Sequence, residues 1–252
     1  MRVFAALTTL LAVAGCAGSG SDSSSKPEAS PVLLATYTGI LPCADCAGIR
    51  TDLWIYAEQH AGEASRYGLR ETYIGTRGGD RTVERTGHLT VSHGTASERE
   101  ATVYQIESDL PDGRRNFVRA GDNELRLLDR EKRELPSSTP RSLYRAVTLV
   151  EGDTGKVIDI SAGERVIVRL PSNRTTGYSW ALLTSGSDAL TRLASEYTQV
   201  VQSDGKPGAQ GVESWYFQAK GSGQQELRFE YRRPWERNVP AAKSTNYTIR
   251  VR

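Results

Sequence analysis

Cysteine, histidine and phenylalanine are scarce in this 252-residue sequence, and neither sign of charge is in clear surplus. The chain has three cysteines, three histidines and four phenylalanines, and its formal net charge is +2. Lysine and arginine are interleaved with aspartate and glutamate, whereas nucleic-acid-binding domains gather positive charge into one patch. The sequence therefore excludes nucleic acid as a partner.

Familiar catalytic patterns are missing too. The three histidines are His60, His88 and His93. None belongs to a Gly-x-Ser-x-Gly elbow or a His-Glu-x-x-His helix, and no glycine loop of the phosphate-binding kind occurs. The carboxylates are dispersed among basic neighbours, as in residues 129–134, which is typical of a solvated turn. We therefore expect a protein that is not an enzyme and that requires no cofactor.

No apolar stretch is long enough for a permanent membrane helix, which needs about 20 residues. Residues 3–13 are apolar and follow Arg2, a pattern typical of an export signal. The small residues Ala14 and Gly15 then precede Cys16, and this ending resembles a bacterial lipobox, in which cleavage occurs before an acylated cysteine. An ordinary signal peptide with an incidental Cys16 is the alternative, but such signals rarely place cysteine at the cleavage site.

Lipidation of Cys16 is the preferred interpretation. Residues 1–15 are then a lipoprotein signal peptide, and the acyl chains on Cys16 anchor the protein in a lipid bilayer. Ala17 follows Cys16, as it does in lipoproteins sorted to the outer membrane. We expect an outer-membrane lipoprotein of the bacterial cell envelope.

The remaining length predicts two domains. Residues 16–32 are rich in glycine and serine and are expected to form a flexible tether. A second break at residues 135–140 contains two prolines and two serines, although Leu143 and Tyr144 are assigned to a last strand of the first domain. The predicted domains are residues 33–146 and 147–252, each large enough for its own core.

Apolar residues recur at every second position along both domains, which predicts β-strands. In the first domain the alternating residues include Leu53 and Ile55, Tyr104 and Ile106, and Leu125 and Leu127. In the second they include Val166, Val168 and Leu170, then Trp215, Phe217 and Ala219, then Leu227, Phe229 and Tyr231, and then Tyr247, Ile249 and Val251. We expect an all-β chain whose second domain is an immunoglobulin-like sandwich. Residues 189–197 show helical spacing and predict one helix.

Three segments between the expected strands of the second domain have the composition of binding loops. They are Asn-Arg-Thr-Thr-Gly-Tyr-Ser-Trp at 173–180, a glycine-rich stretch at 205–211 that ends in Gly-Ala-Gln-Gly, and Arg-Pro-Trp-Glu at 233–236. Glycine permits positive φ and close approach of a partner, and a tryptophan after proline is a rigid aromatic anchor.

These three segments, in this order, closely resemble the loops of chagasin-like inhibitors of papain-type cysteine peptidases. The resemblance covers about residues 147–252 and implies a sandwich whose three loops enter the active-site cleft of the peptidase. The peptidase-binding residues that it implies are Asn173, Thr175, Thr176, Gly177, Gly208, Gly211, Arg233, Pro234 and Trp235. Arg174 replaces the proline usual in the first loop, a change that the resemblance links to lower rigidity. Trp180, Trp215 and Tyr231 fall on strand positions and are expected in the core.

The first domain contains a closely spaced cysteine pair, Cys43 and Cys46, within Thr-Gly-Ile-Leu-Pro-Cys-Ala-Asp-Cys at 38–46. In an oxidising compartment such a pair forms a disulfide, or it binds a soft metal such as copper if the thiolates stay reduced. Both interpretations stay open. Residues 37–49, 69–75 and 125–129 resemble the N-terminal domain of NlpE lipoproteins, which implies a small lipocalin-like β-barrel and a link to copper resistance and envelope stress.

Together these features predict a membrane-anchored inhibitor of papain-like cysteine peptidases. The alternative is a copper-binding or envelope-stress-sensing lipoprotein that acts through the cysteine pair.

Overall fold

The computed structural model describes residues 30–58, 62–107, 114–201 and 207–252. The expected signal peptide and Cys16 lie outside these ranges. Within them the chain forms fifteen β-strands and two short 3-10 helices, which confirms the all-β fold class. None of the described residues belongs to a helix long and apolar enough to cross a membrane.

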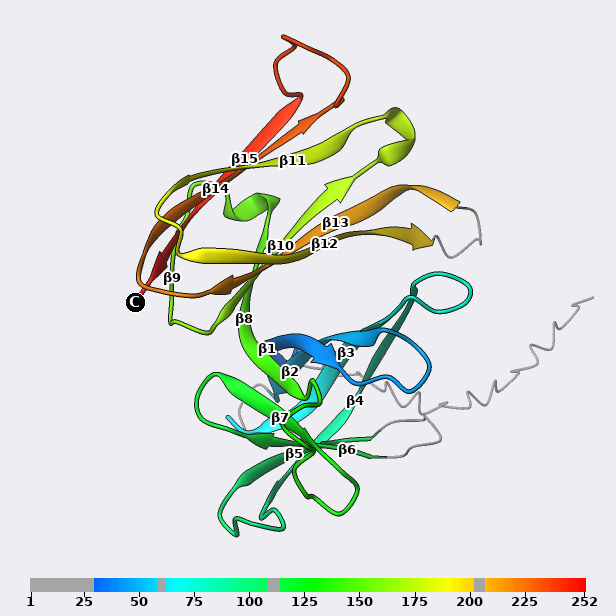
Figure 1. Ribbon diagram of the computed structural model, residues 1–252, viewed down its shortest axis with the longest axis vertical. Coiled ribbons are helices and arrows are strands. Elements are labelled where there is room, and N and C mark those ends of the chain that lie inside the picture. The colour runs from blue at the N-terminus through cyan, green and yellow to red at the C-terminus, as the bar shows by residue number, and fades with distance from the viewer. Residues whose placement is uncertain (1–29, 59–61, 108–113, 202–206) are drawn as a thin grey trace, which may run out of the picture.

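The first eight strands form the expected closed barrel, in which consecutive strands pair antiparallel (Figure 1). Pairing of β1 with β8 closes it, with Thr36 opposite Ala146. The strands are β1 (Val32–Leu41), β2 (Gly48–Ala57), β3 (Ala64–Ile74), β4 (Arg81–His93), β5 (Thr102–Ile106), β6 (Arg115–Arg119), β7 (Glu124–Leu128) and β8 (Ser142–Val150). The period-two pattern places Leu53 and Ile55 in the barrel core, whereas the intervening Trp54 is partly exposed.

The second domain consists of two sheets packed face to face. One has the order β8-β10-β13-β12 and the other the order β11-β14-β15-β9. The elements are η1 (Glu151–Asp153), β9 (Val157–Ile160), β10 (Arg165–Ser172), η2 (Arg174–Thr176), β11 (Ser179–Gly186), β12 (Leu190–Val201), β13 (Pro207–Ala219), β14 (Gly223–Arg232) and β15 (Lys243–Val251).

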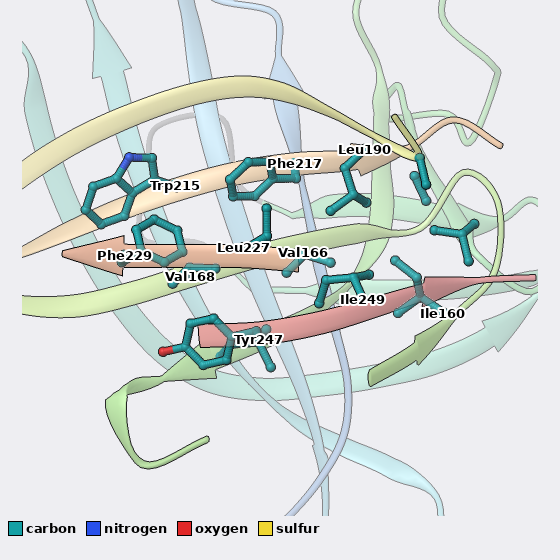
Figure 2. Packing of buried hydrophobic residues seen from close by; sticks show 14 of the residues in the cluster. Ile160, Val166, Val168, Leu190, Trp215, Phe217, Leu227, Phe229, Tyr247 and Ile249 are labelled. Carbon is teal, nitrogen blue, oxygen red and sulfur yellow. The ribbon is translucent and has the colours of Figure 1, made fainter. Parts of the chain in front are cut away.

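Aromatic side chains from both sheets fill the core of the sandwich. Figure 2 shows Trp215 and Phe217 of β13 beside Phe229 of β14 and Tyr247 of β15. The ring centroids of Trp215 and Phe229 are 4.8 Å apart, and those of Phe229 and Tyr247 are 6.2 Å apart. Burial of each such side chain contributes about 1.5–3 kcal/mol, so this layer holds the two sheets together.

The helix predicted for residues 189–197 is wrong, because these residues form most of β12. This strand pairs antiparallel with β13 and has register shifts between Arg192 and Ala194 and between Gln199 and Val201. Leu190 and Leu193 are three residues apart, so a strand places them on opposite faces, and Leu190 is buried while Leu193 is exposed. Pairing with β13 outweighs the helical spacing of the apolar residues.

Strand β8 runs through both domains. Ala146 pairs with Thr36 of the barrel and also with Arg165 of β10, and the following residues to Val150 continue parallel to β10. The position expected for the domain boundary therefore lies inside a continuous strand. A fragment starting at Val147 would lack half of this strand.

A buried ionic cluster also joins the domains. Arg169 Nη2 of the sandwich lies 2.5 Å from Asp52 Oδ2 of the barrel. Tyr216 donates a hydrogen bond of 2.7 Å to Glu196, which also pairs with Arg50 of the barrel. Burial raises the pKa of Asp52, although the charge of Arg169 opposes this. Breaking such pairs leaves a buried charge without a partner, so the cluster fixes one domain against the other.

Candidate functional site

The loop after β10 is built around Asn173, which caps the 3-10 helix η2. Its Oδ1 accepts hydrogen bonds from the backbone N of Thr175 at 3.2 Å and from the Thr175 hydroxyl at 2.6 Å. The Thr176 hydroxyl donates to the Asn173 carbonyl at 2.6 Å. Asn173 and both threonines are thus engaged within the loop, and these bonds set its shape.

Gly177 ends η2 in the left-handed conformation, with φ +79°. A Cβ at this position would lie 2.3 Å from Cη2 of Trp235, closer than real Cβ atoms approach a neighbour. Trp235 belongs to the connection between β14 and β15, and 66% of its surface is exposed. The absent side chain of Gly177 therefore makes room for this indole, and the two loops pack directly against each other.

Arg233 joins the same two loops. Its Nε donates to the Thr176 carbonyl at 3.2 Å, and its guanidinium lies over the Tyr178 ring, 4.6 Å from the centroid. Glu236 pairs with Arg233 at 2.9 Å, and this hydrogen bond raises the pKa of the guanidinium. The ring of Tyr178 stacks on Tyr231 at 5.2 Å. We call residues 173–178 and 233–236, which include Pro234, the loop cluster.

Arg174 is held by the sheet below it. Its Nη2 lies 3.4 Å from Oε2 of Glu213, whose side chain is 5% exposed, and its guanidinium lies 4.4 Å from the centroid of the Tyr197 ring. Glu213 also accepts a hydrogen bond of 2.6 Å from Ser172 at the end of β10. An ion pair with a buried acid restrains the loop where the resemblance predicts a proline. Sequence reasoning missed Glu213 and Tyr197, which are close to Arg174 only after β12 and β13 pair.

The second loop expected at residues 205–211 is a strand from Pro207 onward. Its residues 205–206 lie outside the described part of the chain, and β13 begins at Pro207, so Gly208 and Gly211 lie on a strand rather than in a loop. Gly211 pairs with Ser172 and does not have a positive φ. A Cβ there would lie 2.5 Å from the Tyr197 ring. Gly211 leaves room for the Tyr197 ring, which lies against Arg174. It therefore contributes to the site through Tyr197 and Arg174.

The three aromatic residues that the sequence assigns to the core lie in it or pack against it. Trp180 and Trp215 are buried, and Tyr231 packs against the core with its hydroxyl accepting a hydrogen bond of 2.8 Å from the Asn173 backbone N. Trp180 Nε1 donates to the Pro171 carbonyl at 2.9 Å. This aromatic layer supports the loop cluster from beneath.

Comparison with known families separates the chain into two parts. Residues 37–138 match the model of the NlpE N-terminal domain, and residues 159–251 match the model of the chagasin family peptidase inhibitor I42. The chain joins an NlpE-type domain to a chagasin-type domain. The loop cluster belongs to the chagasin-type domain.

Relatives agree with this division. Chagasin from Trypanosoma cruzi is 27% identical over 106 residues, which cover 40% of this chain and 92% of chagasin. Lipoprotein NlpE from Escherichia coli strain K12 is 25% identical over 180 residues, which cover 65% of this chain and 69% of that lipoprotein.

Two solved structures are also similar. They are the cysteine protease inhibitor EhICP2 from Entamoeba histolytica, with 20% identity and a TM-score of 0.40, and Amebosin, with 26% identity and a TM-score of 0.35. Each alignment covers 42% of this chain and 96% of the solved one.

The cysteine pair of the NlpE-type domain is a disulfide, Cys43–Cys46, in the connection between β1 and β2. Both cysteines pack against the barrel core. One ligand atom each from Cys43, Asp45 and Cys46 lies within 4.8 Å of the others. Metal binding requires thiolates, so the oxidised pair does not fit copper, whereas the reduced pair with Asp45 offers a small set of ligands suited to a soft ion.

Proposed function

We propose that the protein inhibits papain-like cysteine peptidases by placing the loop cluster in the active-site cleft, and that it performs no catalysis itself. The observation that carries this proposal is the packing of Gly177 against Trp235, which joins the first and third loops of a chagasin-type domain into one surface. Trp235 is exposed although it is a large aromatic residue, which is typical of a contact residue.

The shape of the cluster supports blocking without cleavage. Internal hydrogen bonds of Asn173, Thr175 and Thr176 hold the central backbone, and Arg233 holds the third loop to it. A preorganised loop loses little conformational entropy on binding. Thr175, Thr176 and Gly177 would face the catalytic cysteine, Pro234 and Trp235 would flank it, and Arg233 would act through the loops it joins.

The test is an inhibition constant against papain and several related peptidases. The full chain is used with Cys16→Ser, which removes the proposed acylation site, because a fragment starting at Val147 would cut β8. We expect reversible inhibition, with the inhibitor recovered intact by mass spectrometry. No inhibition of any of these enzymes, or cleavage of the inhibitor at the rate of an ordinary substrate, would contradict the proposal.

Trp235→Ala tests the anchor. If Trp235 is a hot spot, truncation costs about 2–4 kcal/mol, which corresponds to a loss of affinity of about thirtyfold or more. Val239→Ala is the matched control, since Val239 is exposed on the same connection but lies outside the cluster. Equal inhibition constants for the two variants would remove Trp235 from the binding surface.

We further propose that acylated Cys16 anchors the protein in the outer membrane, supported by the residues before it and by the NlpE-type domain. Cys16→Ser should release the protein from membranes into the soluble fraction. Retention of the variant in outer-membrane fractions would place the anchor elsewhere.

A second function, copper binding or envelope-stress sensing, is favoured by the grouping of Cys43, Asp45 and Cys46. Titration with Cu(I) should show tight binding by the reduced protein and none by the oxidised protein. The Cys43→Ser, Cys46→Ser double variant should bind none. Unchanged binding by the double variant would exclude the pair as the copper site.

A further inference from the structure

A cleft of about 700 Å³ lies where the barrel meets the sandwich. Its wall includes Ile40 of β1 and Tyr144 of β8 on the barrel side, and Arg165, Leu193 and Tyr216 on the sandwich side. This volume falls within the range of small-molecule sites, which occur preferentially between domains. Arg165 begins the strand that ends at Ser172, so the cleft is roughly 20 Å from the loop cluster, at about 3.3 Å per residue.

The charges lining the cleft do not balance. Four arginines line it, Arg50, Arg126, Arg141 and Arg165, against one acid, Glu124. Three of the arginines have acidic partners, which are Glu196 for Arg50, Glu124 for Arg126 and Glu134 for Arg141. Burial acts to raise the pKa of Glu124, but hydrogen bonds from Arg126 and Ser142 outweigh it and lower this pKa, so the acid is already ionised and engaged.

Arg165 is the unpaired charge. Among the described residues no carboxylate oxygen lies within 4.0 Å of its guanidinium nitrogens, and burial lowers the pKa of Arg165 although the more distant charge of Asp52 opposes this. Nη1 donates to the Thr38 carbonyl at 3.1 Å, and the Tyr144 ring covers one face with its centroid 4.6 Å away. Its Nε is buried and has no hydrogen-bond partner in the described structure. Arg165 itself is half-buried, and a buried donor such as its Nε costs free energy unless an acceptor reaches it.

Part of the rim of the same cleft is apolar, whereas the exposed Ser137 and Ser138 also line it. Ile40 is 44% exposed and Leu193 is 43% exposed, although both are large aliphatic residues. Pro140 and Ala194 also line the cleft. A cation below a partly apolar rim matches a molecule that carries an oxyanion on a short hydrocarbon body.

We propose that this cleft binds an anionic amphiphile whose carboxylate or phosphate accepts hydrogen bonds from Arg165 and whose hydrocarbon part covers Ile40 and Leu193. A guanidinium presents paired donors that suit either kind of oxyanion. The site is independent of peptidase inhibition, since none of its residues belongs to the loop cluster.

The test uses calorimetric titration of the full chain with Cys16→Ser, which needs no detergent. The probes are decanoate and decyl phosphate, each below its micellar concentration, with decanol as the uncharged analogue and acetate and inorganic phosphate as anions without a tail. We expect saturable 1:1 binding of at least one amphiphilic anion, and affinities at least tenfold weaker for decanol, acetate and phosphate. The stronger of decanoate and decyl phosphate identifies the head group.

Two variants locate the site. Arg165→Met keeps the length of the side chain without its charge, and Leu193→Glu places a negative charge on the exposed rim, where it should leave the fold intact. Each should weaken binding at least tenfold. Arg145→Met is the matched control, because Arg145 lies on the same strand as Tyr144 but pairs with Glu164 and does not line the cleft.

Thermal unfolding of each variant verifies that it folds. If Arg165→Met does not fold, the binding measured for Leu193→Glu tests the location of the site. The proposal is overturned if neither amphiphilic anion binds saturably, if decanol binds as tightly as the stronger of the two anions, or if the folded variants bind like the wild type.

Discussion

The loop cluster and the cysteine loop, residues 42–47, are held in contrasting ways. The cysteine loop is closed by one covalent bond between residues three positions apart. The loop cluster depends on contacts between residues far apart in sequence, such as the hydrogen bond from Arg233 to Thr176 and the packing of Trp235 on Gly177. The cysteine loop can therefore form locally, whereas the loop cluster forms only once the sandwich is complete.

The largest effect on inhibition should come from filling the space between the first and third loops of the loop cluster, where Gly177 faces Trp235. Gly177→Ala introduces a Cβ that overlaps the Trp235 indole, so the anchor must move. We expect a loss of inhibition of about thirtyfold or more, comparable to removal of the indole. The inhibition constant against papain measures it.

Gly163→Ala is the control for Gly177→Ala. Gly163 has φ +87°, and a Cβ there would meet nothing within 4 Å. Both variants incur the cost of a left-handed alanine, about 1–2 kcal/mol of stability, but only one displaces Trp235. Similar inhibition by the two variants would show that the contact between the loops is irrelevant to binding.

A smaller effect is expected at Arg174. Arg174→Ala removes the ion pair with Glu213, and we expect inhibition to weaken by about three- to tenfold, since a partly exposed pair contributes about 1 kcal/mol. Arg174→Pro should recover much of this loss if the pair serves to restrain the loop, because proline fixes φ. If Arg174→Ala inhibits as strongly as the wild type, the ion pair between Arg174 and Glu213 does not position the loop.

The smallest effect on inhibition should come from the cysteine loop. The Cys43→Ser, Cys46→Ser variant should inhibit like the wild type, because the disulfide lies in the barrel. It should lower the stability of the barrel by about 2 kcal/mol, the loop-closure contribution of so short a ring. Denaturant unfolding measures this, and a changed inhibition constant would reveal coupling between the two domains.

Much of the fold could be predicted from alternation. The buried positions of β14 and β15 alternate, because each strand has one face on the core, whereas β10 and β13 are also buried on their other face, where Ile167 and Tyr216 pack against Ala146. The pattern misled at residues 189–197, where residues with helical spacing form most of β12. It also could not show that Gly208 and Gly211 are strand residues, since residues 208–211 contain only two side chains, too few to reveal alternation.

The sequence by itself determined the strand content, the order of the two domains, the proximity of the cysteines and the residue types of the loops. These depend on local patterns and on neighbours along the chain. Tertiary structure decided that Gly177 makes room for Trp235, that Glu213 holds Arg174, that β8 serves both domains and that no acid of the described ranges pairs with Arg165. Each of these depends on how strands far apart in sequence pair and pack, and a local pattern carries no information about that register.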